Sequence, residues 1–167
     1  MSSSNPDDWP RITDLAGLDA EDFKYRNTQF LKGDTVYEQT GHETFEQLRR
    51  QIWNVRNSDL REVFRQFPRD DPLREQCAGW MHAVVGNHFF PDANHRTAVV
   101  LLRRLLRQNG INYRTWSRSR LAAVRDKSHT VRGEIEPIRL DTLYQRDRLY
   151  DVWLEFFEEE LVVTTEE

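Results

Sequence analysis

The 167-residue sequence has one cysteine, seven glycines and no long apolar run. A single cysteine excludes an internal disulfide and favours a reducing compartment. No apolar stretch approaches the roughly 20 residues that cross a bilayer, and the first residues lack the basic and apolar regions of a secretion signal. The sequence therefore predicts a cytoplasmic protein without a membrane partner, in which Cys77 is a buried core residue.

Lysine is also scarce, because only three of the 24 basic residues are lysines. The net charge of −4 hides a strong asymmetry. Residues 103–132 contain nine basic residues and one acidic residue, whereas residues 133–167 contain three basic and eleven acidic residues. Such a basic block is either a solvated face paired with the acidic tail or a surface that attracts phosphate-bearing ligands.

Strand patterns are few, and helical periodicity dominates. In Asp71–Asn87 the apolar positions share one helix face, Asp71-Pro72 supplies a start and Gly86 a stop. Further helices are expected from about His42 to Val55, over Leu60–Phe67, over Asn94–Gln108 with Asn109-Gly110 as its C-cap, over Ser117–Asp126 and over Arg139–Leu161. We expect one all-α domain over residues 1–167, with six to eight helices, the helix from Asn94 at its centre and residues 1–10 flexible.

Two short stretches have extended character. Asp34–Thr40 is bounded by glycines and has β-forming residues at its centre, so it predicts either a short hairpin flap or an ordinary surface turn. Ile111–Tyr113 predicts another extended piece.

The most polar feature is the stretch His88–Ala98, HFFPDANHRTA, which leads into an apolar helix. Pro91 prevents a continuous helix, so a loop is expected up to Ala93, followed by a helix from Asn94. The free N–H groups and the dipole of a helix start favour anions, phosphate above all. Arg96 and Thr97 fall in that first turn.

Asp92 and His88 complete a site for phosphoryl or nucleotidyl transfer. A carboxylate beside bound phosphates needs a bridging Mg²⁺, and a histidine can accept a proton near neutral pH. One alternative is a capped loop in which an Asp–Arg ion pair is structural. Another is a metal hydrolase that uses His82, His88, Asp92 and His95.

HFFPDANHRTA resembles the Fic/Doc motif, His-x-Phe-x-Asp/Glu-Ala/Gly-Asn-(Gly/Lys)-Arg. It is most similar to the Doc branch, the toxin half of the death-on-curing toxin–antitoxin pair. There the motif reads His-x-Phe-x-Asp-Ala-Asn-Lys-Arg-Thr-Ala and precedes an apolar helix that ends in Asn-Gly, as the run from His88 to Gly110 does. The resemblance covers about residues 42–150, does not place the first 30 residues, and implies a Fic-fold helical bundle with a β-hairpin flap.

The resemblance also implies a role for each motif residue. His88 would be the general base, Phe90 would anchor the loop, Asp92 would hold Mg²⁺ on the phosphates of ATP, and Arg96 would bind phosphate. The other nucleotide-binding positions would be Ala93, Asn94, His95 and Thr97. The flap would dock the protein target by strand addition through Thr35, Val36, Tyr37 and Glu38.

The Doc branch transfers the γ-phosphate of a nucleotide to elongation factor Tu, so the resemblance implies a toxin kinase that acts on a translation factor. Relatives that transfer AMP carry glycine where this chain has His95, and a second arginine where it has Val99. A side chain at position 95 would crowd the anion site, which favours the kinase. An AMP transferase and a catalytically decayed interaction module are the alternatives.

Two further sequence features bear on how the protein is inhibited and on whether it binds nucleic acid. The family's inhibitory pattern, Ser/Thr-x-x-x-Glu-Gly/Asn, has only near misses beginning at Ser58 and Thr130, which predicts control by an antitoxin in trans. An RNA-binding or RNA-cleaving toxin would use the basic block. Because that block has only Tyr113 and Trp116 as interleaved aromatics, a nucleic-acid partner is not expected.

Overall fold

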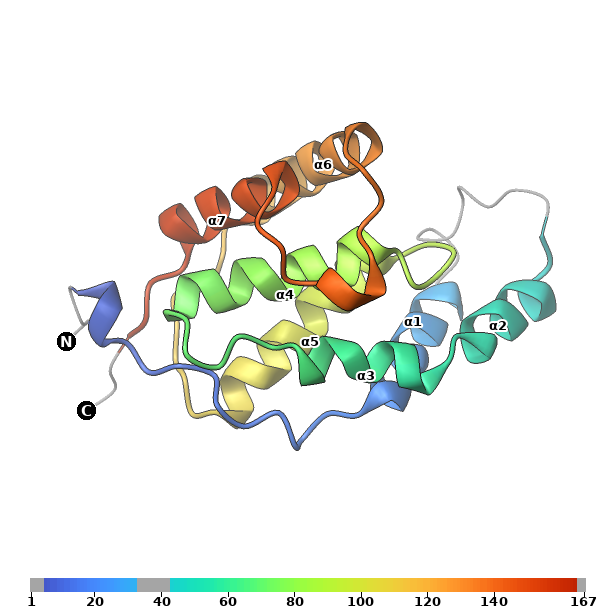
Figure 1. The fold of residues 1–167 in the computed structure, drawn as a ribbon, viewed down its shortest axis with the longest axis horizontal. Helices are drawn as coiled ribbons and strands as arrows, with labels where there is room; N and C mark the ends of the chain where they lie inside the picture. Colours follow the sequence, from blue (N-terminus) through green and yellow to red (C-terminus); the bar gives the residue numbers. More distant parts are fainter. Residues whose placement is uncertain (1–4, 33–42, 165–167) are drawn as a thin grey trace.

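The computed structural model describes residues 5–32 and 43–164, and this part of the chain is helical almost throughout (Figure 1). Its α-helices are α1 Ala20–Lys32, α2 Phe45–Asn54, α3 Asn57–Arg65, α4 Leu73–Asn87, α5 Asn94–Gln108, α6 Arg118–Glu134 and α7 Arg148–Glu160, with 3₁₀ turns at Pro6–Asp8 and Leu140–Thr142. The expected all-α class with six to eight helices is confirmed. The predicted flap and His42 lie outside the described residues.

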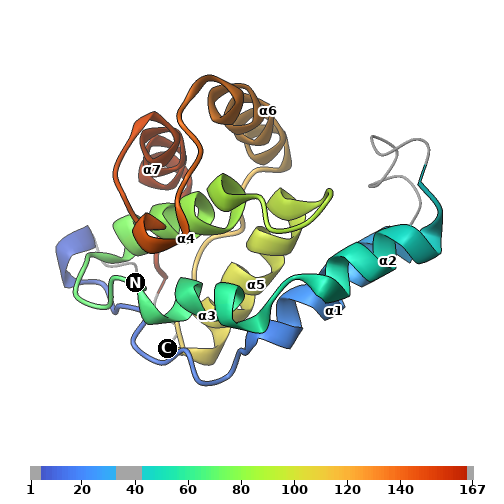
Figure 2. The same cartoon turned by 45° about the vertical axis from the view of Figure 1, so that its right-hand side comes forward.

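The centre of the bundle is α4 rather than the expected α5. Its residues from Gln76 to Gly86 are all buried, because α7 and α6 lie over one side of it and α5 and α3 lie on the other (Figures 1 and 2). Cys77 is buried here, as predicted, and burial raises the pKa of its thiol. In α5 the apolar residues form one buried stripe, and its arginines remain at the surface.

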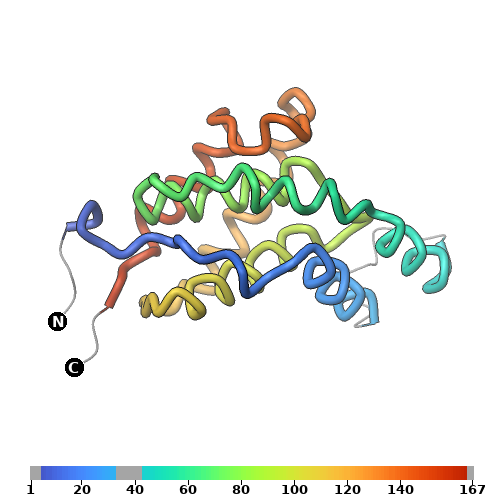
Figure 3. The backbone as a smooth tube through the Cα atoms, turned by 60° about the horizontal axis from the view of Figure 1, so that its bottom comes forward, coloured from blue at the N-terminus to red at the C-terminus, as the bar shows by residue number. Residues whose placement is uncertain are grey.

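The first 30 residues, which the sequence patterns left unplaced, contain α1. Its buried face includes Lys24, Asn27 and Thr28, so it lacks the apolar stripe by which helices are recognised. The chain before α1 runs in an extended path along the bundle (Figure 3). It is held there by Gln76, whose Oε1 accepts the Ile12 N–H at 2.8 Å and whose Nε2 donates to the Ile12 carbonyl at 2.9 Å. The expected flexibility of residues 1–10 does not hold for Trp9, which is buried under the Arg74 guanidinium.

Two predicted helix boundaries lie far from the observed ones, whereas the helix expected over Leu60–Phe67 is shifted only slightly, to α3 at Asn57–Arg65. The helix expected over Ser117–Asp126 continues to Glu134, because Val124, Ser128 and Val131 keep facing the bundle. The helix expected over Arg139–Leu161 begins only at Arg148. Asp147 starts it by accepting the N–H groups of Leu149 and Tyr150 at 3.0 and 3.1 Å.

Gly86 does not end α4, because the helix continues to Asn87. A Cβ atom at Gly86 would lie 2.6 Å from Cγ1 of Ile138, so glycine lets the segment after α6 pack directly on α4. The predicted C-cap of α5 is confirmed: Gly110 has φ +69°, and the Ile111 N–H donates to the Leu106 carbonyl at 2.9 Å.

Extended structure is minimal in the described ranges, where Tyr113 pairs with Val163 in one isolated antiparallel bridge. None of the described helices is both long enough and apolar enough to span a bilayer.

Candidate functional site

The loop between α4 and α5 is clamped by the side chain of Asn94. Its Oδ1 accepts the Phe90 N–H at 3.1 Å, and its Nδ2 donates to the Phe90 carbonyl at 2.9 Å and to His88 Nδ1 at 3.1 Å. His88 and Ala93, at the two ends of the loop, have φ of 57° and 61°, and they are the non-glycine residues with positive φ in the described structure. Strained conformations of this kind persist where the surroundings enforce them, and they cluster at functional sites.

The loop is also fixed from α1. Nδ2 of the fully buried Asn27 donates to the Asp92 carbonyl at 2.9 Å and to Thr97 Oγ1 at 3.0 Å. The side chain of Thr97 therefore faces the interior and positions the loop, rather than reaching a ligand as expected. Sequence reasoning missed Asn27, because a polar residue in an unrecognised helix gave no signal.

Asp92 lies just before the start of α5, and Arg96 lies in the first turn of that helix. Asp92 Oδ1 accepts the Ala93 N–H at 2.8 Å, so the half-buried carboxylate sits at the N-terminus of the helix. Arg96 is exposed and makes no hydrogen bond or ion pair with another described residue. The structural Asp–Arg ion pair considered above is thus not formed. Phe90 is buried in the core, as the predicted role of loop anchor requires.

His88 is held as a neutral imidazole. Protein atoms around its ring withdraw it from water although it reaches the surface, and this desolvation, together with the charges of Arg132 and His129, lowers its pKa to about 4. The two backbone contacts of Phe90 fix the orientation of the Asn94 amide, so it is the N–H group that faces His88 Nδ1. Since Nδ1 accepts this hydrogen bond, the proton of the neutral ring is on Nε2.

His95 points away from the loop, into the junction of α5, α6 and α7. Its Nε2 lies 2.8 Å from Ser128 Oγ, which also accepts the Trp153 Nε1–H at 3.0 Å, so the two rings share the Ser128 hydroxyl. Burial comes first among the causes that lower the pKa of His95 to about 3, followed by the charges of His129, Arg125, His88 and Arg132. The ring is neutral and structural, while its backbone N–H remains at the start of α5.

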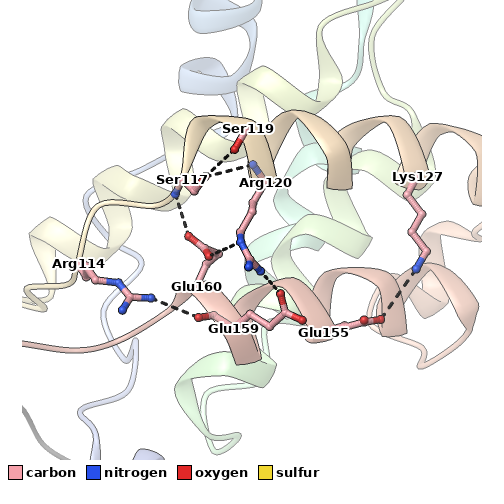
Figure 4. A network of polar contacts seen from close by, with 8 residues as sticks. All are labelled: Arg114, Ser117, Ser119, Arg120, Lys127, Glu155, Glu159 and Glu160. Carbon is pink, nitrogen blue, oxygen red and sulfur yellow. Dashed lines mark hydrogen bonds and ion pairs between the residues drawn. The ribbon is translucent and has the colours of Figure 1, made fainter.

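The part of the basic block that lies on α6 has two differently paired faces. Towards α7, Arg120 pairs with Glu159 and Glu160, and Lys127 lies 3.9 Å from Glu155 (Figure 4). This is the pairing with the acidic tail that the charge pattern allowed. Towards the loop, Arg125 and Arg132 form no ion pair with another described residue. The interpretation as a face paired with the acidic tail therefore holds for the side of α6 towards α7, and the interpretation as a phosphate-attracting surface stays a prediction for the side towards the loop.

Arg125 and Arg96 line one pocket of about 180 Å³ between α5 and α6. Its floor is apolar and includes Phe30, Val99 and Trp153. The pocket reaches the first turn of α5, because His95 and Arg96 belong to its wall.

His82 does not join the loop. Its Nδ1 donates to the Leu143 carbonyl at 2.7 Å, and its Nε2 lies 3.1 Å from Asp147 Oδ2, in the fully buried space between α4 and the start of α7. Within residues 5–32 and 43–164 no three His, Cys, Asp or Glu side chains form a group that could hold a metal ion. The metal-hydrolase alternative therefore loses two of its four residues, His82 and His95.

The predicted site residues thus separate by role. His88, Asp92, Ala93, Asn94 and Arg96 gather at the loop and the start of α5, whereas Thr97 and the ring of His95 face inwards. The predicted docking residues Thr35, Val36, Tyr37 and Glu38 lie outside the described residues. Comparison of the chain with family models, with curated proteins and with solved structures found no match.

Proposed function

We propose that this chain is a Doc-like enzyme of the Fic/Doc type, which transfers a phosphoryl group from a nucleoside triphosphate to a hydroxyl group of a protein. The observation that carries the proposal is the strained loop, in which Asn94 joins His88 to the start of α5 and Asn27 fixes the backbone of Asp92. This loop brings together a histidine, a carboxylate, a helix N-terminus and Arg96, an arginine that pairs with no other described residue.

In the proposed reaction the target oxygen forms a bond to the γ-phosphorus, the bond from that phosphorus to the bridging β–γ oxygen breaks, and the nucleoside diphosphate leaves. His88 takes the hydroxyl proton. Its low pKa keeps the ring neutral at pH 7 but makes it a weak base, and negative phosphates bound beside it would raise its pKa towards neutrality. Acceptance at Nε2 also requires the Nδ1–H tautomer, so the contact with Asn94 must break or rearrange when the substrates bind.

Mg²⁺ fits this loop as a cofactor of the nucleotide. A single half-buried carboxylate, Asp92, stands at the anion-binding helix start, and Mg²⁺ is commonly held by one or two carboxylates together with phosphate oxygens and water. It would neutralise charge on the phosphates. The chain's own contribution is the positioning of the carboxylate by the Ala93 N–H and by Asn27.

AMP transfer remains the second candidate, because the ring of His95 is bound to Ser128 and does not crowd the start of α5. In that reaction the target oxygen would attack the α-phosphorus and pyrophosphate would leave. The crowding argument for the kinase is weakened by this contact. The proposed setting is cytoplasmic, with a translation factor such as elongation factor Tu as the target and an antitoxin in trans as the regulator.

The test is to incubate the protein with ATP, Mg²⁺ and purified translation factors, and to weigh the intact targets by mass spectrometry. A phosphate increment supports the kinase and an AMP increment supports the transferase. We expect His88→Ala and Arg96→Gln to abolish either signal, and Arg118→Gln to retain it. Arg118 is the matched control, because it is also exposed and without a hydrogen bond to another described residue. Modification that persists in His88→Ala, or no modification with any nucleotide, contradicts the proposal.

A further inference from the structure

The face of α6 that is turned towards the loop carries positive charge. Arg125, Ser128, His129 and Arg132 follow the spacing of neighbours on one side of a helix, and the contact of Ser128 with His95 fixes this side against the start of α5. Arg125 shares a pocket with Arg96. The charges of Arg132 and His129 reach His88, and each of the charged groups acting on His88 and His95 is basic.

Arg132 forms no ion pair with another described residue. Its Nε atom is buried and has no hydrogen-bond partner among the described residues, and burial lowers the pKa of its guanidinium. Glu134, two positions along the chain, pairs with Arg148 at 2.9 Å. A buried donor of an unpaired cation is costly, and an anion that accepts its hydrogen bonds would remove that cost.

Arg125 and Arg132 stand two turns apart, which corresponds to about 10 Å along the axis of α6. This separation exceeds the span of one phosphate group, so both arginines can be satisfied together only by an extended anion. Arginine suits such a ligand, because its planar fork binds phosphate oxygens in pairs.

We propose that Arg125 and Arg132 of α6 form a second anion-binding arm, which faces the loop and holds the polyphosphate chain of a nucleotide between α6 and the start of α5. The proposal deepens the proposed function and rests on it for the identity of the ligand. Phosphate binding is thereby assigned to a helix outside the motif. Arg125 and Arg132 would bind a ligand, whereas Arg120 and Lys127 on the other face of α6 pair with α7.

Binding is measured without transfer, by isothermal titration calorimetry at low ionic strength. The probes are tripolyphosphate, inorganic phosphate, ATP and a short single-stranded RNA. We expect tripolyphosphate and ATP to bind at least about tenfold more tightly than inorganic phosphate. Loss of a charge-assisted contact in Arg132→Gln should weaken the binding of tripolyphosphate by about tenfold or more, and Arg125→Gln should weaken it severalfold.

Control variants distinguish binding by this arm from a general effect of positive charge and from an effect on catalysis. Arg118→Gln removes the same charge from an exposed position of α6 and should leave tripolyphosphate affinity within about twofold, and circular dichroism confirms that each variant is folded. His88→Ala should retain binding of tripolyphosphate. If the wild-type protein binds tripolyphosphate but transfers no group to any translation factor, the proposed function is rejected and the arm stands. Equal losses in Arg118→Gln and Arg132→Gln, wild-type affinity in Arg132→Gln, or arginine-dependent binding of RNA alone would overturn the proposal.

Discussion

Replacement of Asn94 tests whether one side chain organises the candidate site. Asn94→Ala removes three hydrogen bonds of 2.9 to 3.1 Å, and two of them satisfy the backbone N–H and carbonyl of the buried residue Phe90. Each bond contributes about 1 kcal/mol net, and buried groups left without partners add to the loss. We therefore expect Asn94→Ala to lower the free energy of unfolding by roughly 3 kcal/mol.

Urea denaturation followed by tryptophan fluorescence measures this loss. The matched control is Asn87→Ala, at the last residue of α4, where the half-buried side chain donates a single hydrogen bond of 3.2 Å to the Ile138 carbonyl. That substitution should cost about 1 kcal/mol. If Asn94→Ala costs no more than Asn87→Ala, the side chain does not hold the loop, and the reasoning about the site fails at its first step.

Asn94→Asp separates the hydrogen bond to His88 from the packing of the loop. The carboxylate can still accept the Phe90 N–H, but it presents an oxygen where the amide presented a donor to His88 Nδ1. A hydrogen bond then forms only if Nδ1 carries a proton, so the pKa of His88 should rise from about 4 by roughly one to three. An NMR titration of the histidine ring protons gives the value. A His88 pKa that stays near 4 in the variant would refute the assigned amide orientation and tautomer.

Other contacts yield shorter tests. Asp147→Ala removes the N-cap of α7 and the partner of a buried histidine, and should cost about 2 kcal/mol in urea denaturation. Burial raises the pKa of Asp147, but its hydrogen bonds outweigh burial and lower the pKa overall. The ionised carboxylate therefore stabilises the fold above the pKa that Asp147 has in the unfolded chain, and this stabilisation is lost as the pH falls through its pKa in the folded protein. Asp147→Ala should accordingly make the free energy of unfolding depend less on pH in the acid range. Ser128→Ala should lower the free energy of unfolding by about 1–3 kcal/mol, because two buried ring nitrogens lose their hydrogen-bond partner. A smaller loss than that caused by replacing an exposed serine would contradict this prediction. Gly86→Ala should lower the melting temperature through overpacking of about 1–3 kcal/mol, and an unchanged melting temperature would show that the neighbouring loop yields freely.

The elements that the sequence predicts well are those whose buried face is apolar. The helices from Leu73 and from Asn94, with the proline-broken loop between them, follow from periodicity and from Pro91, and both were located correctly. Where burial is polar, the pattern fails: α1 buries Asn27 and Thr28, and Asp147 starts α7 inside a stretch that looks continuously helical. Local propensity also led to a wrong prediction for Gly86. The glycine does not stop α4; it is needed because Ile138 packs too closely on the helix for a Cβ atom.

At the site, the sequence indicates which residues belong together but not which way they point. The side chains of Asp92 and Arg96 stay near the helix start, in agreement with the loop-and-helix pattern. The inward rotation of His95 depends on Ser128, 33 positions away, and no local signal encodes that contact. The same holds for Arg132, whose relation to His88 arises only when α6 packs beside α5.

The low pKa of His88 and the unpaired arginines of α6 are two consequences of one electrostatic arrangement. Burial is the main cause of the low pKa values of His88 and His95, and the basic groups gathered around the loop lower them further; the same groups attract an anion. An anion bound between α6 and the start of α5 would cancel part of this field and raise the pKa of His88, which brings the ring closer to the proton affinity that a general base requires. By linkage, protonation of His88 would in turn tighten the binding of that anion. Occupancy of the anion site and the basicity of His88 therefore rise together, so a histidine too weakly basic in the free protein becomes competent when its phosphate-bearing substrate is in place.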